Sequence, residues 1–239
     1  MYETDKSLNK FISETGICSR READRLIEEG RVTINGKIAQ KGNRVVPTDD
    51  VRINGKPLVA KPDTVYIAFH KPRGITCTTD PKDPTNIIDF IRFPERIFPI
   101  GRLDKDSDGL IFLTNDGDIV NKVLRAGNNH EKEYLVTVNK PITDDFIQKM
   151  AGGVPILDTV TQPCLIRQED RFEFRIILTQ GLNRQIRRMA EVLGYEVRTL
   201  TRVRIMHVWL DYIRVGEWRF FTKKEIDEMD KKVQDSAKN

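Results

Sequence analysis

Apolar side chains recur at helical spacing near the start of the chain. Between residues 8 and 12 they lie three and four positions apart, and Gly16 supplies a stop. Ser19 and Glu22 then have the spacing of a capping box, and one apolar face continues until Gly30. The pattern predicts two short consecutive helices.

The periodicity then changes from helical to alternating. Residues 32–34 alternate up to the dipeptide Asn35-Gly36, and residues 51–53 alternate up to Asn54-Gly55. Asn-Gly after an alternating run favours a tight turn between antiparallel strands. We therefore expect a compact module of two short helices and a few short strands in residues 1–60. The stretch PLVAKPDT, residues 57–64, carries two prolines and predicts a linker.

Strand-like and helix-like runs alternate in the rest of the chain, residues 61–239, which we expect to form a second domain. Apolar strand-like runs occupy residues 65–69, 97–100, 110–113, 134–138, 172–178 and 197–200, and helical patterns occupy residues 118–126, 143–151, 183–193 and 223–232. This mixture predicts an α+β fold built on an extended, mostly antiparallel mixed sheet.

Composition supports two globular domains. Of the 239 residues 38% are hydrophobic and 32% are charged, which is enough apolar material to build cores. The first residues contain no apolar signal segment and no run could cross a bilayer, so we expect a cytoplasmic protein. Three cysteines and three histidines are scattered along the chain, and their spacing predicts neither a disulfide framework nor a metal site.

The positive charge of the chain is small in total but concentrated in one segment. The formal net charge is only +4, but residues 171–219 contain ten arginines, no lysine and five acidic residues. Because the planar guanidinium binds phosphate bidentately and stacks on bases, this segment favours a nucleic-acid surface. A solvated charged face remains the simpler alternative.

The stretch LNKFISETGICSRREADRLIEEGRVTINGK resembles the S4 RNA-binding domain. The resemblance covers about fifty residues: a Gly before Ser-Arg-Arg, an Ala on the helix, and Gly-Arg-Val followed by Asn-Gly. It implies RNA contacts from the basic residues Lys10, Arg20, Arg21, Arg25, Arg31 and Lys37. Arg20 and Arg21 fall in the first turn of a predicted helix, whose free N-H groups favour an anion. Two ordinary surface arginines at a helix start are the alternative.

The segment GRLDKDSDGLIFLTNDGD, residues 101–118, places Asp104 between an arginine-bearing turn and an apolar strand. Asp104, Asp106 and Asp108 at alternate positions also suggest a calcium loop. Such a loop requires Glu at its twelfth position, where this chain has Asn115, so we expect no metal here.

This segment and two later ones together resemble the RNA pseudouridine synthases, in the branch that acts on ribosomal RNA and carries an N-terminal S4 domain. Gly-Arg-Leu-Asp marks the catalytic Asp of the family and falls on Asp104. Lys132-Glu133-Tyr134 matches a second motif, and GLNRQIRRM, residues 181–189, matches a third that contains Arg187. The resemblance spans roughly residues 6–222, with the three motifs predicted on a strand, a strand and a helix start.

The resemblance implies a role for each matched residue. Asp104 would be the catalytic carboxylate, as a nucleophile or in proton removal, and Arg187 its cationic partner, with Arg184 as the alternate one helical turn away. Tyr134 would stack on the target base, Leu200 would lie under the catalytic pair, and Arg102 would help to extrude the base. Taken singly, Asp104 could instead cap a turn, Tyr134 could be a strand aromatic, and Arg187 could be a solvated helix charge.

The predicted function is the isomerisation of uridine to pseudouridine in RNA, with 23S ribosomal RNA as the expected partner. The reaction transfers no group to a second molecule and changes no oxidation state, so we expect no cofactor. We also expect a monomer. The alternative is a non-catalytic S4-type RNA-binding or ribosome-assembly protein, which would share the S4 module but would not need the three motifs together.

Overall fold

The structure is a computed structural model that describes residues 5–58, 63–124 and 130–235. The chain divides into two compact units. The first contains the N-terminal residues up to Val65 together with residues 93–97 and 115–117, and the second contains residues 66–92, 98–114 and the chain from Asp118 onward. Within the described ranges, no helix has the length and the apolar character that a bilayer crossing needs.

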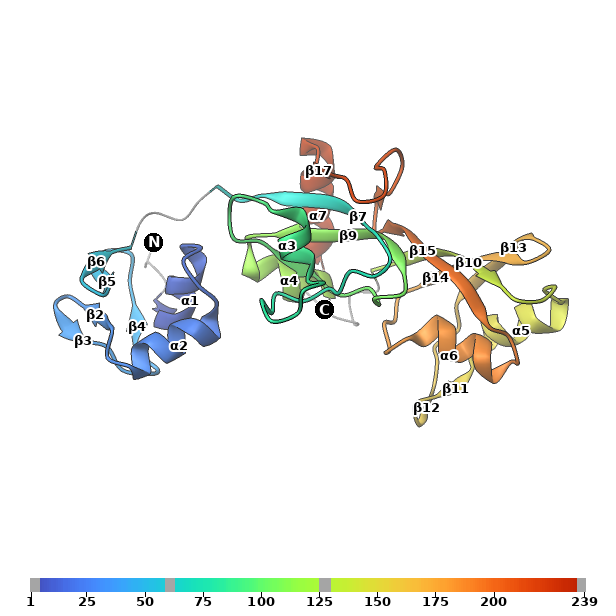
Figure 1. The fold of residues 1–239 in the computed structure, drawn as a ribbon, viewed down its shortest axis with the longest axis horizontal. Coiled ribbons are helices and arrows are strands. Elements are labelled where there is room, and N and C mark those ends of the chain that lie inside the picture. Colours follow the sequence, from blue (N-terminus) through green and yellow to red (C-terminus); the bar gives the residue numbers. More distant parts are fainter. Residues whose placement is uncertain (1–4, 59–62, 125–129, 236–239) are drawn as a thin grey trace. The chain divides into compact units, whose positions relative to one another are not determined.

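The first unit has the two helices and the short strands that its sequence predicts (Figure 1). Its elements are β1 (Lys6–Ser7), α1 (Leu8–Glu14), α2 (Arg20–Glu28), β2 (Val32–Ile34), β3 (Lys37–Ile38), β4 (Arg44–Val45), β5 (Val51–Ile53) and β6 (Lys56–Pro57). Strand β1 pairs with β4, and the other four form a sheet in the order β3-β2-β5-β6. The Ser19 hydroxyl accepts a hydrogen bond from the Glu22 amide at 3.1 Å, as the capping pattern predicts.

Both Asn-Gly turns are also as predicted, because Asn35 and Asn54 have φ values of +50° and +51°. The linker prediction is wrong at its first residue, since Pro57 pairs with Arg52 in the β5–β6 ladder. Its residues 59–62 lie outside the described part of the chain. The core of this unit is apolar and joins both helices to the sheet, with Leu8, Ile12, Ala23, Leu26, Ile27, Val32, Ala39, Val45, Val51 and Ile53 buried.

The second unit is built on a nine-stranded mixed sheet. Its elements are β7 (Tyr66–Lys71), α3 (Ile87–Ile91), β8 (Phe98–Ile100), β9 (Asp108–Thr114), α4 (Gly117–Leu124), β10 (Lys132–Val138), α5 (Asp144–Gly152), β11 (Pro155–Ile156), β12 (Thr159–Val160), β13 (Leu165–Asp170), β14 (Glu173–Leu178), α6 (Gln185–Val192), β15 (Val197–Ile205), β16 (Val208–Trp209), β17 (Trp218–Phe220) and α7 (Lys223–Asp235). The strand order is β13-β14-β10-β15-β9-β7-β17, with β16 on β15 and β8 on β9.

Antiparallel pairing dominates this sheet, as the α+β prediction requires. Strands β15 and β9 are the exception: they run parallel, with Thr201 opposite Asp108 and Arg202 opposite Gly109. This pair joins two segments about ninety residues apart in the chain, with Leu200 on β15 and Asp104 four residues before β9.

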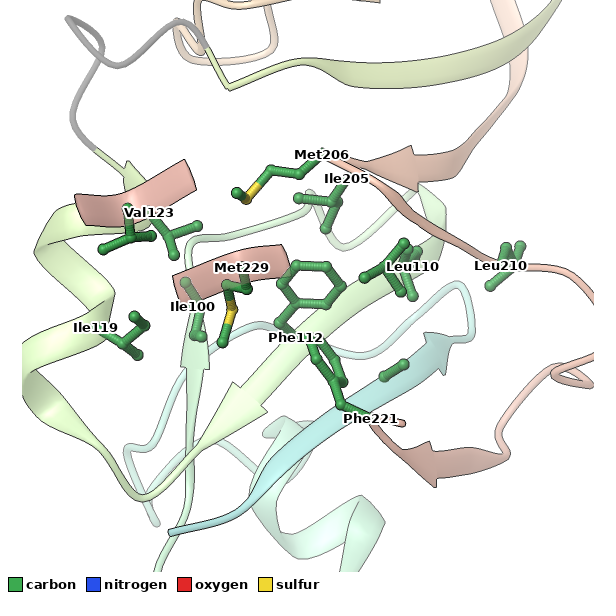
Figure 2. Close-up of a cluster of buried hydrophobic side chains, with 13 residues drawn as sticks. Ile100, Leu110, Phe112, Ile119, Val123, Ile205, Met206, Leu210, Phe221 and Met229 are labelled. Atoms are coloured by element: carbon green, nitrogen blue, oxygen red, sulfur yellow. The ribbon is translucent and has the colours of Figure 1, made fainter. Parts of the chain in front are cut away.

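The main core covers one face of the sheet (Figure 2). Leu110 and Phe112 of β9 point into it beneath α4 and α7, and the Phe112 ring meets Phe221 edge-to-face at 4.8 Å. Because side chains alternate along a strand, Gly109 and Ile111 face the other side. Ile111 and Leu113 are also fully buried, so β9 is covered on both faces, and this cluster lies on the face opposite position 109.

Within the described ranges, two helix boundaries differ from the predictions by two residues or more. Helix α6 begins at Gln185 and not at residue 183, because Arg184 has a left-handed backbone with φ +50°. Helix α7 continues beyond residue 232 to Asp235. The predicted helix over residues 118–126 is found as α4, and its last two residues lie outside the described ranges.

Candidate active site

Asp104 lies in the loop between β8 and β9, ahead of the apolar strand as predicted. The backbone of this loop is fixed at several points. The Leu103 amide donates to Cys77 Sγ at 3.4 Å, and the Ser107 amide donates to the Asp104 carbonyl at 3.0 Å. The Gly74 amide donates to the Lys105 carbonyl at 2.7 Å. The Asp104 side chain is 33% exposed, so a well-anchored loop presents a carboxylate that a substrate can reach.

Arg184 provides the guanidinium at this carboxylate. Its Nη1 atom lies 4.0 Å from Asp104 Oδ2 and 3.4 Å from Asp106 Oδ2. The prediction that Arg187 pairs with Asp104 is therefore wrong, and the alternate residue makes the contact. The physical reason is that the donors of Arg187 bind the Asp106 carbonyl, the Ser107 hydroxyl and the Val197 carbonyl, whereas Arg184 lies before the helix and reaches the carboxylates.

Arg187 instead anchors the loop. Its Nη2 atom donates to the Asp106 carbonyl and to the Ser107 hydroxyl, both at 3.1 Å, and Nη1 donates to the Val197 carbonyl at 3.4 Å. Ser107 is fully buried. Burial, followed by the charge of Arg184, lowers the pKa of the Arg187 guanidinium, while Asp104 and Asp106 oppose the shift. Arg187 thus ties α6 to the loop and to the start of β15.

Tyr134 and Leu200 lie on neighbouring strands of the same sheet. Tyr134 of β10 is opposite Arg202 of β15, and Leu200 is opposite Val136, two residues further along β10. Both side chains are largely buried, at 9% and 5% exposure. The ladder therefore groups Tyr134 and Leu200 beside Arg202, while their predicted contacts with substrate stay predictions.

Two buried cations near the loop were missed by the sequence analysis. Lys71, at the end of β7, is fully buried and its Nζ atom donates to the carbonyls of Pro72 and Ile75 at 2.8 and 2.9 Å. Burial lowers the pKa of the Lys71 ammonium. Arg202 is the second. In the sequence YIAFHK a lysine ends an apolar strand, and this pattern could have indicated that Lys71 is buried. The sequence around Arg202 contains no comparable indication.

Lys132, two residues before Tyr134, is a third shielded cation. Burial lowers its pKa to about 8, with a smaller contribution from the charge of Arg202. Its Nζ atom donates to the His130 carbonyl at 3.4 Å. The second family motif therefore contains an ammonium group that titrates close to neutral pH.

Several arginines of the arginine-rich segment are engaged in ion pairs within the protein. Arg175 and Arg204 both bind the buried Glu133 carboxylate, at 2.8 and 2.7 Å, and Arg219 binds Glu225 at 2.7 Å. Burial raises the pKa of Glu133, but hydrogen bonds from the two arginines outweigh this effect and the net shift is downward. These three arginines hold the sheet and α7 together, so the sequence-based expectation is wrong for them.

Some of the basic residues predicted to contact RNA in the S4 module are exposed, and others form ion pairs with glutamates. Arg20 and Arg21 are exposed in the first turn of α2, and Lys37 is exposed on β3. Arg25 forms ion pairs with Glu22 and Glu29, Arg31 with Glu29, and Lys10 with Glu14. Arg102 is likewise exposed, two residues before Asp104.

A partly exposed, anchored carboxylate beside a guanidinium is suited to nucleophilic or base chemistry. The fixed loop limits the conformations of the backbone that carries Asp104. Such a group can attack an electrophilic carbon or accept a proton.

Comparisons with known proteins assign the family. The RNA pseudouridylate synthase model matches residues 65–192 and the S4 domain model matches residues 7–51. Dual-specificity RNA pseudouridine synthase RluF of Salmonella typhi is 59% identical, covering 98% of this chain and 82% of the relative. Ribosomal large subunit pseudouridine synthase B of Bacillus subtilis strain 168 is 34% identical, covering 97% and 98%.

A solved structure agrees with the sequence comparisons. A crystal structure of a pseudouridylate synthase aligns with a TM-score of 0.69 and 30% identity, covering 93% of this chain and 99% of that one. The chain therefore belongs to the RNA pseudouridine synthases, enzymes that isomerise uridine within RNA, and carries an S4 domain ahead of its synthase domain.

Proposed function

We propose that this enzyme isomerises a specific uridine of 23S ribosomal RNA, with Asp104 as its catalytic carboxylate. The observation that carries the proposal is the approach of Arg184 to Asp104 on an anchored loop, in a chain that belongs to this family. The name of the Bacillus subtilis relative, which refers to the large ribosomal subunit, supports the choice of RNA.

The reaction breaks the bond between ribose C1′ and uracil N1 and forms one between C1′ and C5. One proton leaves C5 and one is taken up at N1, so atoms and electrons balance without a cofactor. Asp104 acts as nucleophile or accepts a ribose proton. Arg184 places its guanidinium beside the carboxylate and Arg187 holds its loop.

The target uridine must leave its stack before the reaction, at a cost of a few kcal/mol. Arg102 beside the loop assists this extrusion, and Tyr134 stacks on the flipped base and takes part in proton transfer. Leu200 supplies the apolar floor under the base. Arg20 and Arg21, with Lys37, hold the RNA backbone, and the paired residues Lys10 and Arg25 support them.

Residues 1–60 position the RNA in this proposal and residues 61–239 perform the chemistry. One chain supplies Asp104, Arg184 and Tyr134, so the enzyme acts as a monomer, in the cytoplasm where ribosomal RNA is assembled. Light scattering at assay concentration tests the monomer, since a mass of twice 27.6 kDa would contradict it.

The direct test incubates the purified protein with unmodified bacterial ribosomal RNA and maps pseudouridine by carbodiimide treatment and primer extension. The wild type should yield a stop at one position of 23S RNA. Asp104→Asn should abolish the stop and keep RNA affinity within a few-fold. Asp106→Asn makes the same change at the other carboxylate near Arg184 and should keep turnover. Product formation by Asp104→Asn would refute the assignment.

The alternative of a non-catalytic assembly protein predicts RNA binding without any product, and membership of the synthase family argues against it. The name of the Salmonella typhi relative, a dual-specificity synthase, motivates one additional substrate in the assay. Unmodified transfer RNA is the substrate to add, and a stop in it would extend the proposal to a second class of RNA.

A further inference from the structure

Arg202 is a buried charged residue that the reaction steps above do not use. Only 4% of its surface is exposed, in the middle of β15. It lies opposite Tyr134 on one side and opposite Gly109 on the other. Removing a guanidinium from water is costly unless its donors are satisfied. An arginine in this place therefore needs a structural or functional reason.

The guanidinium of Arg202 bridges the two ends of the Asp104 loop. Its Nε atom donates to the Leu110 carbonyl at 2.7 Å, within β9, and its Nη1 atom donates to the Arg102 carbonyl at 3.3 Å. Arg102 precedes Asp104 by two residues and Leu110 follows it by six. One side chain thus holds the chain before and after the carboxylate.

Other side chains could not make this bridge equally well. The guanidinium presents several N-H groups in a fixed planar fork, whereas an ammonium is a single point on a flexible stem. Gly109 allows the necessary approach of the strands, because a Cβ atom there would clash with the backbone of Arg202. Burial also keeps Arg202 away from the RNA, unlike the exposed Arg184.

One donor of Arg202 has no partner. The Nη2 atom is buried and makes no hydrogen bond within the described part of the chain. His130, Arg187 and His207 each have one such buried atom as well. The feature that distinguishes Arg202 is therefore its pair of hydrogen bonds to the chain on either side of Asp104.

We propose that Arg202 is a positioning residue for the reaction: it holds the backbone of the Asp104 loop so that the carboxylate meets both Arg184 and the flipped uridine. The inference rests on the proposed function, in which Asp104 is catalytic. It predicts an effect on the chemical step and not on RNA binding.

The test compares Arg202→Met with Arg204→Met in the full-length protein. Arg204 is a matched control, because it is a largely buried arginine on the same strand whose ion pairs go to Glu131 and Glu133 and not to the loop. For Arg202→Met, the single-turnover rate on ribosomal RNA should fall about 100-fold, as expected for a misplaced catalytic group, with an RNA dissociation constant within twofold of wild type. Arg204→Met should lower the melting temperature and keep the rate within about threefold, since it breaks a buried ion pair away from the loop.

Hydrogen exchange of the peptide spanning residues 102–107 provides the second measurement. Exchange should accelerate in Arg202→Met and stay at the wild-type rate in Arg204→Met. Arg202→Lys keeps the charge but cannot span both carbonyls, so it should show the same loss of rate, and it serves if the Met variant does not fold.

Three results would overturn the inference: a folded Arg202 variant with a wild-type rate, an equal loss of rate and RNA affinity, or a loss of rate without faster exchange of the loop. A different result would contradict the proposed function itself: the wild type would make no pseudouridine, or Asp104→Asn would remain active.

Discussion

The Arg184 guanidinium lies 4.0 Å from the Asp104 carboxylate, and Arg184 reaches it from a left-handed backbone conformation immediately before helix α6. This conformation is unfavourable for a residue with a side chain. Such strain collects at functional sites, where the surrounding structure enforces it. The helix start is therefore shaped to point one arginine at the carboxylate while Arg187, a turn later, grips the loop.

Replacing this arginine should slow the chemical step. In Arg184→Gln the carboxylate loses its cation, and the single-turnover rate should fall about 100-fold, as for the loss of one electrostatic contact in other active sites. Arg188→Gln is the matched control, because Arg188 lies four residues later in α6 and its side chain bonds Asn183. Its rate should stay within about threefold of wild type. Equal effects of the two changes would show that general charge, and not the contact with Asp104, matters.

Glu133 should make stability depend on pH. The folded state lowers its pKa below the usual 4.5, so its contribution to stability is fully present above pH 4.5 and is lost as pH falls through the folded-state pKa. Glu133→Gln leaves Arg175 and Arg204 without their shared carboxylate and should cost roughly 3 kcal/mol of unfolding free energy at pH 7.

Urea unfolding at several pH values measures this effect. The difference between wild type and Glu133→Gln should be constant from pH 7 down to 4.5 and should shrink below it. Glu196→Gln is the control, since Glu196 and its partner Arg198 are both exposed, and it should change stability by under about 0.5 kcal/mol. A difference for Glu133→Gln that stays constant far below pH 4 would contradict the assigned cause.

The S4 arginines should determine the salt dependence of RNA binding. Arg20→Ala combined with Arg21→Ala removes two exposed cations from the first turn of α2. The slope of log affinity against log salt should become shallower by about 1.5, because each phosphate contact releases counterions. Arg44→Ala with Arg52→Ala is the control, since both lie in the same unit, are paired with aspartates and have no assigned RNA contact. Fluorescence anisotropy at several salt concentrations measures both, and identical slopes for the two double variants would place the RNA elsewhere.

Gly109 should tolerate no side chain. Its φ is +111° and an added Cβ would clash with the backbone of Arg202, so Gly109→Ala should cost at least about 2 kcal/mol of stability. Gly152→Ala, at the end of α5 with open space around it, should be neutral or slightly stabilising. Thermal unfolding of both variants checks this. A melting temperature for Gly109→Ala equal to wild type would mean that β9 and β15 can move apart without cost.

Local features of this protein could be predicted from its sequence. The Ser19 cap, the two Asn-Gly turns and most helices and strands depend on residues within a few positions of each other, so neighbouring residues carry the signal. The three motifs also identified the family, because each consists of residues that are neighbours in the sequence. The predicted start of helix α6 was wrong because Arg184 has a left-handed backbone conformation, which ends the helix at Gln185 on its N-terminal side.

The pairing inside the site was decided by the tertiary structure. Strands β9 and β15 run side by side although they lie about ninety residues apart, and no local pattern encodes that register. The pairing of β9 with β15 places Arg202 within hydrogen-bond distance of the Arg102 and Leu110 carbonyls, on either side of Asp104. The assembled sheet also determines which arginines of residues 171–219 form ion pairs with carboxylates, as Arg175 does with Glu133. The sequence by itself determined that Asp104 is the candidate carboxylate, because its motif is local. Only the tertiary structure decided that Arg184 meets it and that Arg187 and Arg202 hold its loop, because those contacts form between segments that become neighbours only when the sheet assembles.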